Sequence, residues 1–153
     1  MRKLFLGVSA LLFLDTLLQL YFAGFGVFGE HVVGGDESFT PHSINGQFVL
    51  RGLALLAILF AALAKAGRST IWLTVGIFLM TYVQLIVFIL GGILSGGSRE
   101  HPNLPGAWMV SVHAVTGLLI IFMTYWLFRR ARRLVRTGSA RRAGKRQSVS
   151  TSA

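Results

Sequence analysis

Two histidines in this chain are each followed, four residues later, by a glycine, and this pairing has the clearest chemical meaning in the sequence. The sequence contains His42-x-x-x-Gly46 and, 71 residues later, His113-x-x-x-Gly117. Residues four apart in a helix lie on nearly the same face. Imidazole nitrogens bind haem iron, and a flat macrocycle between two histidines needs neighbours without bulky side chains. We therefore expect one b-type haem (haem b), with His42 and His113 as axial ligands and Gly46 and Gly117 leaving room for the ring.

The same residues also have a simpler interpretation that needs no cofactor. Histidine is tolerated at membrane interfaces because its polar tip reaches water, and glycine lets membrane helices pack closely. A cofactor-free structural or assembly subunit therefore stays open as the alternative. The other histidines, His31 and His101, stand beside Glu30 and Glu100 with no motif around them, and we expect them to be solvated. A zinc site made from all four histidines would match no familiar ligand spacing.

A second group of polar residues lies inside apolar stretches. Counting about 1.5 Å per residue from the expected outer helix end places Asp15 about 20 Å deep, and we expect Arg51 to lie level with it. An isolated charge at such a depth costs about 3 kcal/mol. We therefore predict an intramembrane ion pair between Asp15 and Arg51, with a proton or anion site as the alternative. Gln19 and Gln84 are expected to form interhelical hydrogen bonds.

The composition requires membrane helices to position these residues. Of the 153 residues, 54% are hydrophobic and 13% are charged, and the mean hydropathy is +0.67, which excludes an ordinary soluble domain. About 20 apolar residues are needed to cross the hydrocarbon as a helix, and helices pair their own backbone amides in lipid. The sequence predicts an all-α integral membrane protein, an up-down-up-down four-helix bundle within residues 1–130. Its spans are expected at about 4–28, 44–64, 70–94 and 107–128.

An internal repeat relates the two halves of this expected bundle. At an offset of 65 residues, Phe-Leu-x-Thr-x-x-Gln-Leu occurs twice, beginning at Phe13 and at Phe78, and Gly26 recurs as Gly91. The two His-x-x-x-Gly motifs repeat at the offset of 71. A matching Thr and Gln are harder to obtain by chance than matching Leu and Phe. The bundle is therefore interpreted as two repeated helical hairpins, a parallel tandem duplication.

The distribution of positive charge predicts the orientation of the chain. Of the 15 Lys and Arg residues, 13 fall on the side that holds both termini and one, Arg99, falls on the other, with Arg51 inside the membrane. Positive loops stay in the cytoplasm, so both termini are expected there and the protein in the cytoplasmic membrane. Residues 131–153 are expected to form a basic, disordered cytoplasmic tail that attracts anionic lipids. This tail holds seven of the Lys and Arg residues behind the net charge of +10, and we expect no nucleic-acid partner, with nucleic-acid binding by the tail as the alternative.

Some activities are excluded by composition, and others are left open. The chain has no cysteine, so a disulfide, a thiolate metal site and a cysteine nucleophile are excluded. No arrangement of nucleophile, base and oxyanion donors is recognisable, and whether the protein is an enzyme stays open. A haem protein of this kind would transfer electrons or sense redox state, with a redox or membrane-complex partner besides the bilayer.

The chain has a glutamine-bearing helix followed by a His-x-x-x-Gly helix, and this arrangement occurs twice. In this respect it resembles a family of small four-span bacterial membrane proteins of unknown function. The resemblance covers about residues 4–130, and its most specific part is the pair of motifs at His42/Gly46 and His113/Gly117. More distantly, the chain is similar to one four-helix half of haem A synthase, where histidines of such a bundle hold haem. That likeness implies axial roles for His42 and His113. The chain departs from that enzyme in having a single bundle, which leaves no second haem site.

Overall fold

The protein is described by a computed structural model that covers residues 1–97, 101 and 103–150, of which Asp36 and residues 139–150 are described by their backbone alone. Within these residues the chain is helical and contains no strand. Four stretches are long and apolar enough to cross a membrane, which confirms the predicted fold class. The elements are α1 (Arg2–Val33), α2 (Gly35–Ile44), a π-helical turn η1 (Asn45–Val49), α3 (Leu50–Leu63), α4 (Arg68–Ser95) and α5 (Leu104–Ser150).

The first hairpin is tighter than the sequence suggests. Residues 29–43 were expected to form a connection, but α1 and α2 are separated by Gly34 alone, whose φ of 92° is accessible to glycine without a steric penalty. The second membrane-crossing stretch accordingly runs from Glu37 to Leu63 through α2, η1 and α3. His42 therefore lies within a helix and not at its start.

The π-helical turn lies between His42 and the deeper half of the second span. A π-helical turn closes i→i+5 hydrogen bonds and accommodates one extra residue, which rotates everything after it by about 100° relative to a straight α-helix. The face that α3 presents to its neighbours is therefore different from the one that continuous 3.6-residue periodicity through α2 would predict.

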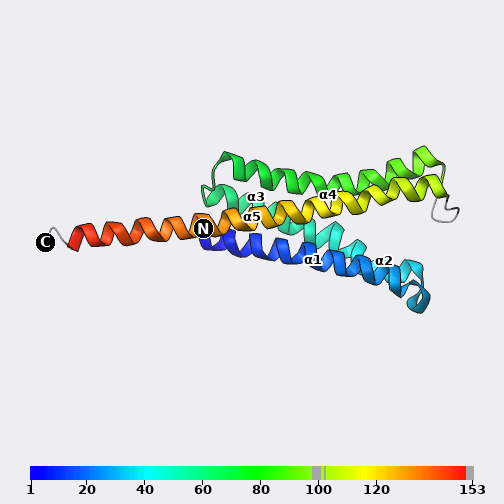
Figure 1. Ribbon diagram of the computed structural model, residues 1–153, viewed down its shortest axis with the longest axis horizontal. Coiled ribbons are helices and arrows are strands. Elements are labelled where there is room, and N and C mark those ends of the chain that lie inside the picture. The colour runs from blue at the N-terminus through cyan, green and yellow to red at the C-terminus, as the bar shows by residue number, and fades with distance from the viewer. Residues whose placement is uncertain (98–100, 102, 151–153) are drawn as a thin grey trace.

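The membrane-crossing helices lie side by side in one bundle (Figure 1). α1 packs against α2, α3 and α5, and α4 packs against α3 and α5. The α2–α3 rod is consequently diagonal to α5, and α1 is diagonal to α4. We call the end with Arg2 and the turn at residues 64–67 the tail end, and the end with Gly34 and residues 96–103 the loop end. In Figure 1 the α1/α2 and α4/α5 pairs diverge toward the loop end.

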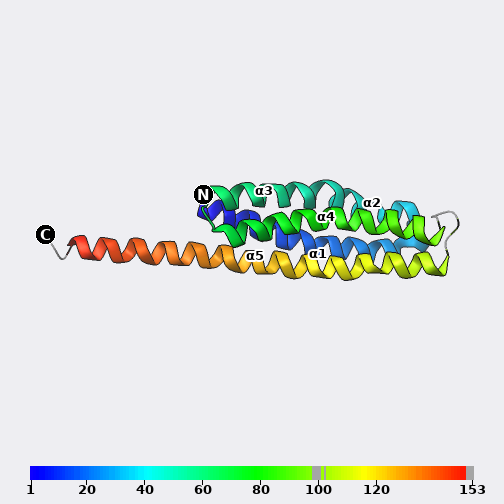
Figure 2. The same ribbon diagram turned by 90° about the horizontal axis from the view of Figure 1, so that it is seen from above.

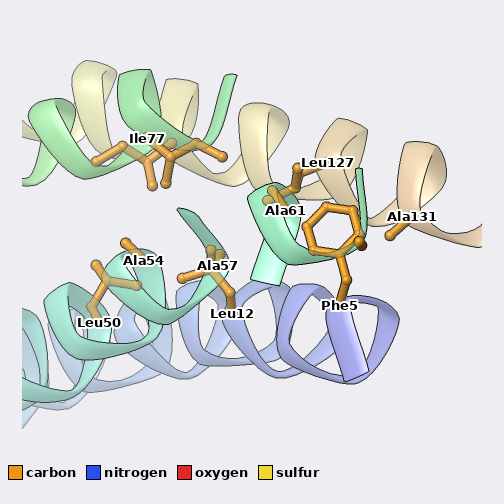
Figure 3. Packing of buried hydrophobic residues seen from close by; sticks show 11 residues of the cluster. Phe5, Leu12, Leu50, Ala54, Ala57, Ala61, Ile77, Leu127 and Ala131 are labelled. Carbon is orange, nitrogen blue, oxygen red and sulfur yellow. The ribbon is translucent and has the colours of Figure 1, made fainter. Parts of the chain in front are cut away.

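The buried apolar core lies mainly toward the tail end (Figure 3). Ala54, Ala57 and Ala61 of α3 are fully buried, and their small side chains let the neighbouring helices approach closely. The larger residues packed around them include Phe5, Leu12, Ile77 and Leu127.

The surface of the bundle is apolar, as expected for contact with lipid. Trp72 and Trp126 are more than half exposed toward the tail end, and Trp108 is exposed toward the loop end. Trp108 and Trp126 are 18 residues apart in α5, which corresponds to about 27 Å of helix. This separation agrees with a hydrocarbon layer of about 30 Å bounded by aromatic residues at both interfaces.

The basic C-terminal segment continues as helix. The sequence predicts disorder over residues 131–153, whereas the structure extends α5 to Ser150 as a single rod well past the rest of the bundle (Figure 2). Ala and Arg, which are frequent in this segment, have high helix propensity. Residues 151–153 lie outside the described part of the chain.

Candidate functional site

The structure brings His42 and His113 together. They come from α2 and α5, which belong to diagonal spans, and their ring centroids are 5.9 Å apart with an interplanar angle of 67°. Both residues are half-buried. Each ring also has an aromatic neighbour from its own hairpin, because Phe39 lies 6.4 Å from the His42 ring and Phe88 lies 4.7 Å from the His113 ring.

His42 is held by Gln19 of α1 through side chain and main chain. The Gln19 amide nitrogen donates to the His42 carbonyl at 2.9 Å and lies 3.3 Å from His42 Nε2. His42 Nδ1 lies 3.2 Å from the Gln19 carbonyl. A carbonyl can only accept, so Nδ1 carries the proton and Nε2 keeps the lone pair. The Gln19 side chain also accepts from Asn45 Nδ2 at 2.8 Å.

Gln84 of α4 holds His113 through the same carbonyl but through the opposite ring nitrogen: its amide faces Nδ1 of His113, whereas the Gln19 amide faces Nε2 of His42. The neighbouring donors and acceptors orient the Gln84 amide so that its nitrogen is 2.8 Å from Thr116 Oγ1, 2.9 Å from His113 Nδ1 and 3.2 Å from the His113 carbonyl. Its oxygen accepts from the Gly117 N–H at 2.9 Å. The main chain of Gln84 also hydrogen-bonds the His113 ring. The predicted interhelical hydrogen bonds of both glutamines are therefore present.

The two motif glycines have a different neighbour from the one expected. A Cβ atom at Gly46 would lie 2.7 Å from the Gln19 amide nitrogen, and one at Gly117 would lie 3.5 Å from the Gln84 amide group. The expected role was to leave room for a macrocycle, but the observed contact is with the glutamine that holds the histidine. The absence of a side chain at these positions therefore lets the amide reach the His carbonyl.

Further contacts correspond between the two hairpins at the offsets of 65 and 71 residues. Gly26 packs tightly against Phe39, and Gly91 packs against Val110, with 3.3 Å between a Cβ placed at Gly91 and the valine methyl group. Asn45 and Thr116, which stand at equivalent positions, each hydrogen-bond the local glutamine at 2.8 Å.

Asp15 and Arg51 do not form the predicted ion pair. The Arg51 guanidinium lies 4.7 Å from the ring centroid of Tyr82 and 3.5 Å from the Thr81 carbonyl, both on α4. Asp15 is 7% exposed and is hydrogen-bonded by the Asn45 side chain. Asp15 Oδ2 and Arg51 Nε have no partner among the described residues.

The expected depth of Arg51 was wrong, and depth also says nothing about rotation around the helix axis. Asp15 is hydrogen-bonded by Asn45, so Arg51, six residues further along the second span, lies more than one turn from the level of Asp15. Arg51 follows the π-helical turn, which rotates it relative to the face of α2 that carries His42. That rotation directs Arg51 toward α4, which is diagonal to the helix that carries Asp15.

The remaining histidines stay apart from this site. His31 is exposed in the last turn of α1, and His101 is exposed in the connection before α5. In the part of the chain that the structure describes, no group of three or more His, Asp or Glu side chains could hold a metal ion. The four-histidine zinc site is therefore not assembled.

Several polar contacts were not anticipated from the sequence. Thr16 and Thr124 bring their hydroxyl groups within 3.2 Å between α1 and α5. Thr116 binds the amide of Gln84. The available signal was the presence of threonines in otherwise apolar spans, but threonine hydroxyls also bond to the preceding turn, as Thr16 and Thr124 do here, so position alone does not identify a partner.

Comparison with known protein families finds a similarity to a family without an assigned function. No curated protein and no solved structure matches the chain. The matched segment begins at Gln19 in α1 and ends in α4, so it includes His42, Gly46 and Gln84. Residues 19–90 match the model of a family of unknown function (DUF6220), and the predicted likeness to such a family is thereby confirmed.

Proposed function

We propose that this multi-pass membrane protein binds one b-type haem between His42 and His113 and transfers electrons or senses redox state. The observation that carries the proposal is the meeting of two imidazoles from diagonal helices at a centroid distance of 5.9 Å. Two Fe–N bonds of about 2 Å, with about 1 Å from each nitrogen to its ring centroid, would place coaxial ligands about 6 Å apart.

The hydrogen bonding of His42 is suited to an axial ligand. Histidine ligands usually donate their second ring N–H to a carbonyl or carboxylate, which fixes the tautomer and the ring orientation. His42 Nδ1 donates to the Gln19 carbonyl and leaves the lone pair on Nε2. For iron to bind Nε2, the Gln19 amide, which lies 3.3 Å from this atom, would have to turn away from the ring. Its hydrogen bond to the His42 carbonyl does not involve Nε2.

The packing toward the loop end also favours a ligand between the hairpins. The buried residues there include Gly26, Gly29, Ser38 and Gly91, and the contacts described for them lie within one hairpin. At this level the described aromatic contact between the hairpins is that of the two histidine rings. Cohesion between the hairpins rests mainly on the apolar core toward the tail end.

The proposed location is the cytoplasmic membrane with both termini in the cytoplasm, supported by the concentration of Lys and Arg toward the tail end. Just beyond Trp126, three arginines of α5 place their guanidinium groups 5.1 to 5.9 Å from aromatic rings one turn earlier: Arg129 over Tyr125, Arg130 over Trp126 and Arg132 over Phe128. Anionic lipid headgroups are the proposed partners of this basic segment. A redox protein in the same membrane is the proposed electron partner.

The proposed origin of the site is duplication of one helical hairpin. The support is that in each hairpin the glutamine amide nitrogen lies within hydrogen-bond distance of the histidine carbonyl and of one ring nitrogen, beside the motif glycine.

The absorption spectrum of the purified protein after expression with haem supply tests the proposal. We expect the sharp visible bands of a reduced six-coordinate low-spin b-type haem. His42→Ala and His113→Ala should each abolish or convert these bands, whereas His31→Ala, a matched exposed histidine, should leave them unchanged. A colourless wild-type protein that is folded and inserted would contradict the proposal.

One observation favours a cofactor-free structural subunit as the second candidate. Both ring nitrogens of His42 already have Gln19 atoms within 3.3 Å, so the ring is accommodated without iron. In that case no variant would be pigmented, and His42→Ala would act only by weakening the packing of α1 against α2.

A further inference from the structure

A ladder of polar side chains runs down the interface between α1 and the second span. Asp15 and Gln19 are four residues apart on α1 and therefore lie on one face. Opposite them stand Asn45 and His42, one turn apart. Asn45 hydrogen-bonds both the Gln19 amide oxygen, at 2.8 Å, and the Asp15 carboxyl group, and Gln19 contacts His42. Asp15 is thus linked to the histidine site through two amides.

The Asp15 carboxyl group is not equipped to carry a negative charge. It is 7% exposed, and its Oδ2 atom is buried with no partner among the described residues. An ionised carboxylate needs hydrogen-bond donors at both oxygens when water is excluded. A neutral acid needs only an acceptor for its hydroxyl group, and helix carbonyls can serve, as Phe13 does for Thr16.

The titratable groups on the helices around α1 do not supply a counter-charge. Arg51, on α3, is directed to Tyr82 and Thr81 of α4. His42 on α2 contacts Gln19, and His113 on α5 contacts Gln84. Tyr125 on α5 packs its ring against Phe13. In the described part of the chain no ion pair includes Asp15, whose one hydrogen-bond partner is the neutral Asn45.

We propose that Asp15 is a proton-binding site inside the membrane whose occupancy follows the charge at the His42–His113 site. The coupled part of this inference rests on the proposed haem. Without the cofactor the carboxyl group is neutral. With haem bound and oxidised, the Asp15 carboxylate balances the net positive charge of the site. When a one-electron donor reduces the site, Asp15 takes up one proton from water.

The physical reason for this coupling is the cost of uncompensated charge in a medium of low dielectric constant. One electron and one proton together leave the net charge of the membrane interior unchanged. Gln19 and Asn45 orient the two sites by hydrogen bonding, and the coupling itself acts through space. Asp15 is accordingly a positioning and charge-balancing residue, since it contacts neither histidine.

The proton on Asp15 can be tested without any cofactor by infrared spectroscopy of the unpigmented protein in lipid at neutral pH. We expect a carboxylic acid carbonyl band that disappears in Asp15→Asn and remains in Asp36→Asn. The chain has two aspartates, Asp15 and Asp36, so carboxyl-13C aspartate shifts the band in the wild-type protein even if Asp15→Asn fails to fold. If Asp15 proved to be ionised in this experiment, the inference would be overturned.

The coupling is tested by the midpoint potential of the pigmented protein as a function of pH. Because reduction takes up a proton, the potential should fall by up to about 59 mV for each tenfold decrease in proton concentration. Asp15→Asn should flatten this dependence and keep the absorption bands, whereas Met80→Leu, at the equivalent position of the other hairpin, should behave as wild type. A dependence that persists in Asp15→Asn overturns the coupling. A protein that never acquires pigment overturns both the proposed function and the coupling. In that case the infrared experiment still tests whether Asp15 binds a proton.

Discussion

The two hairpins of this protein hold their histidines alike and differ one turn deeper. In both, a glutamine of the first helix binds the carbonyl and ring of a histidine on the second, and a glycine makes room for it. Below this level the first hairpin has Asp15 and Asn45, whereas the second has Met80 and Thr116. The shared part is therefore the support of the imidazoles, and the acid is an addition to one half.

The difference at Asp15 and Met80 is instructive because the second hairpin serves as an internal control. It shows that the glutamine–histidine unit forms without a carboxylate nearby, since Gln84 is satisfied by Thr116, His113 and Gly117. The acid in the first hairpin is then not required to build the unit.

The largest effect is expected from giving the second hairpin the acid of the first. Met80→Asp should destabilise the protein by about 3 kcal/mol, because a carboxyl group enters an apolar span without its amide partner. Adding Thr116→Asn should recover about 1 kcal/mol by supplying that partner. Unfolding in mixed detergent micelles measures both. If Thr116→Asn gave no recovery, the Asp15–Asn45 contact would not be the feature that accommodates the acid.

The two motif glycines should differ in their tolerance of a methyl group. Gly46→Ala places a carbon 2.7 Å from the Gln19 amide, whereas Gly117→Ala has 3.5 Å to the Gln84 amide. We expect a loss of about 1–3 kcal/mol for Gly46→Ala and a change within about 0.5 kcal/mol for Gly117→Ala. The same unfolding assay distinguishes them, and equal losses would show that the two hairpins are packed equally tightly.

Removing the glutamines should have smaller and similar effects. Side-chain hydrogen bonds between membrane helices contribute about 0.6 kcal/mol on average and up to about 1.7 kcal/mol. Gln19→Ala should lie at the upper end, because it also removes the Gln19 oxygen that accepts from Asn45 Nδ2, and Gln84→Ala should cost less. Thermal unfolding midpoints of the two variants provide the comparison, which fails if Gln84→Ala is the more destabilising change.

The smallest expected effect is the coupling free energy between Asp15 and Arg51. Because the structure directs Arg51 to α4, the effects of Asp15→Asn and Arg51→Met should add within about 0.5 kcal/mol in a double-mutant cycle. The ion pair that the sequence suggested would instead give a coupling well above that value, since breaking one partner of a buried pair leaves an uncompensated charge.

Much of the fold could be predicted from apolar run length, because backbone amides in lipid have to be satisfied within each helix. The number of spans and the diagonal relation of His42 to His113 follow from four runs joined by short connections. The bounds could not be predicted as well. Gly34 turns the chain in a single residue, so that α2 begins nine residues before the expected start of the second span at residue 44.

The helix content of the bundle and the interhelical hydrogen bonds of the two glutamines were accessible from residue types and spacing. The rotation of each helix was not, because the π-helical turn at Asn45–Val49 leaves no pattern in composition and yet redirects Arg51 toward Tyr82. The identity of the group beside Gly46 was likewise inaccessible: periodicity shows which face a glycine occupies, but only packing of α1 against the second span places the Gln19 amide there. Apolar length is a property of one segment, whereas rotation and contact depend on how neighbouring segments fill space together.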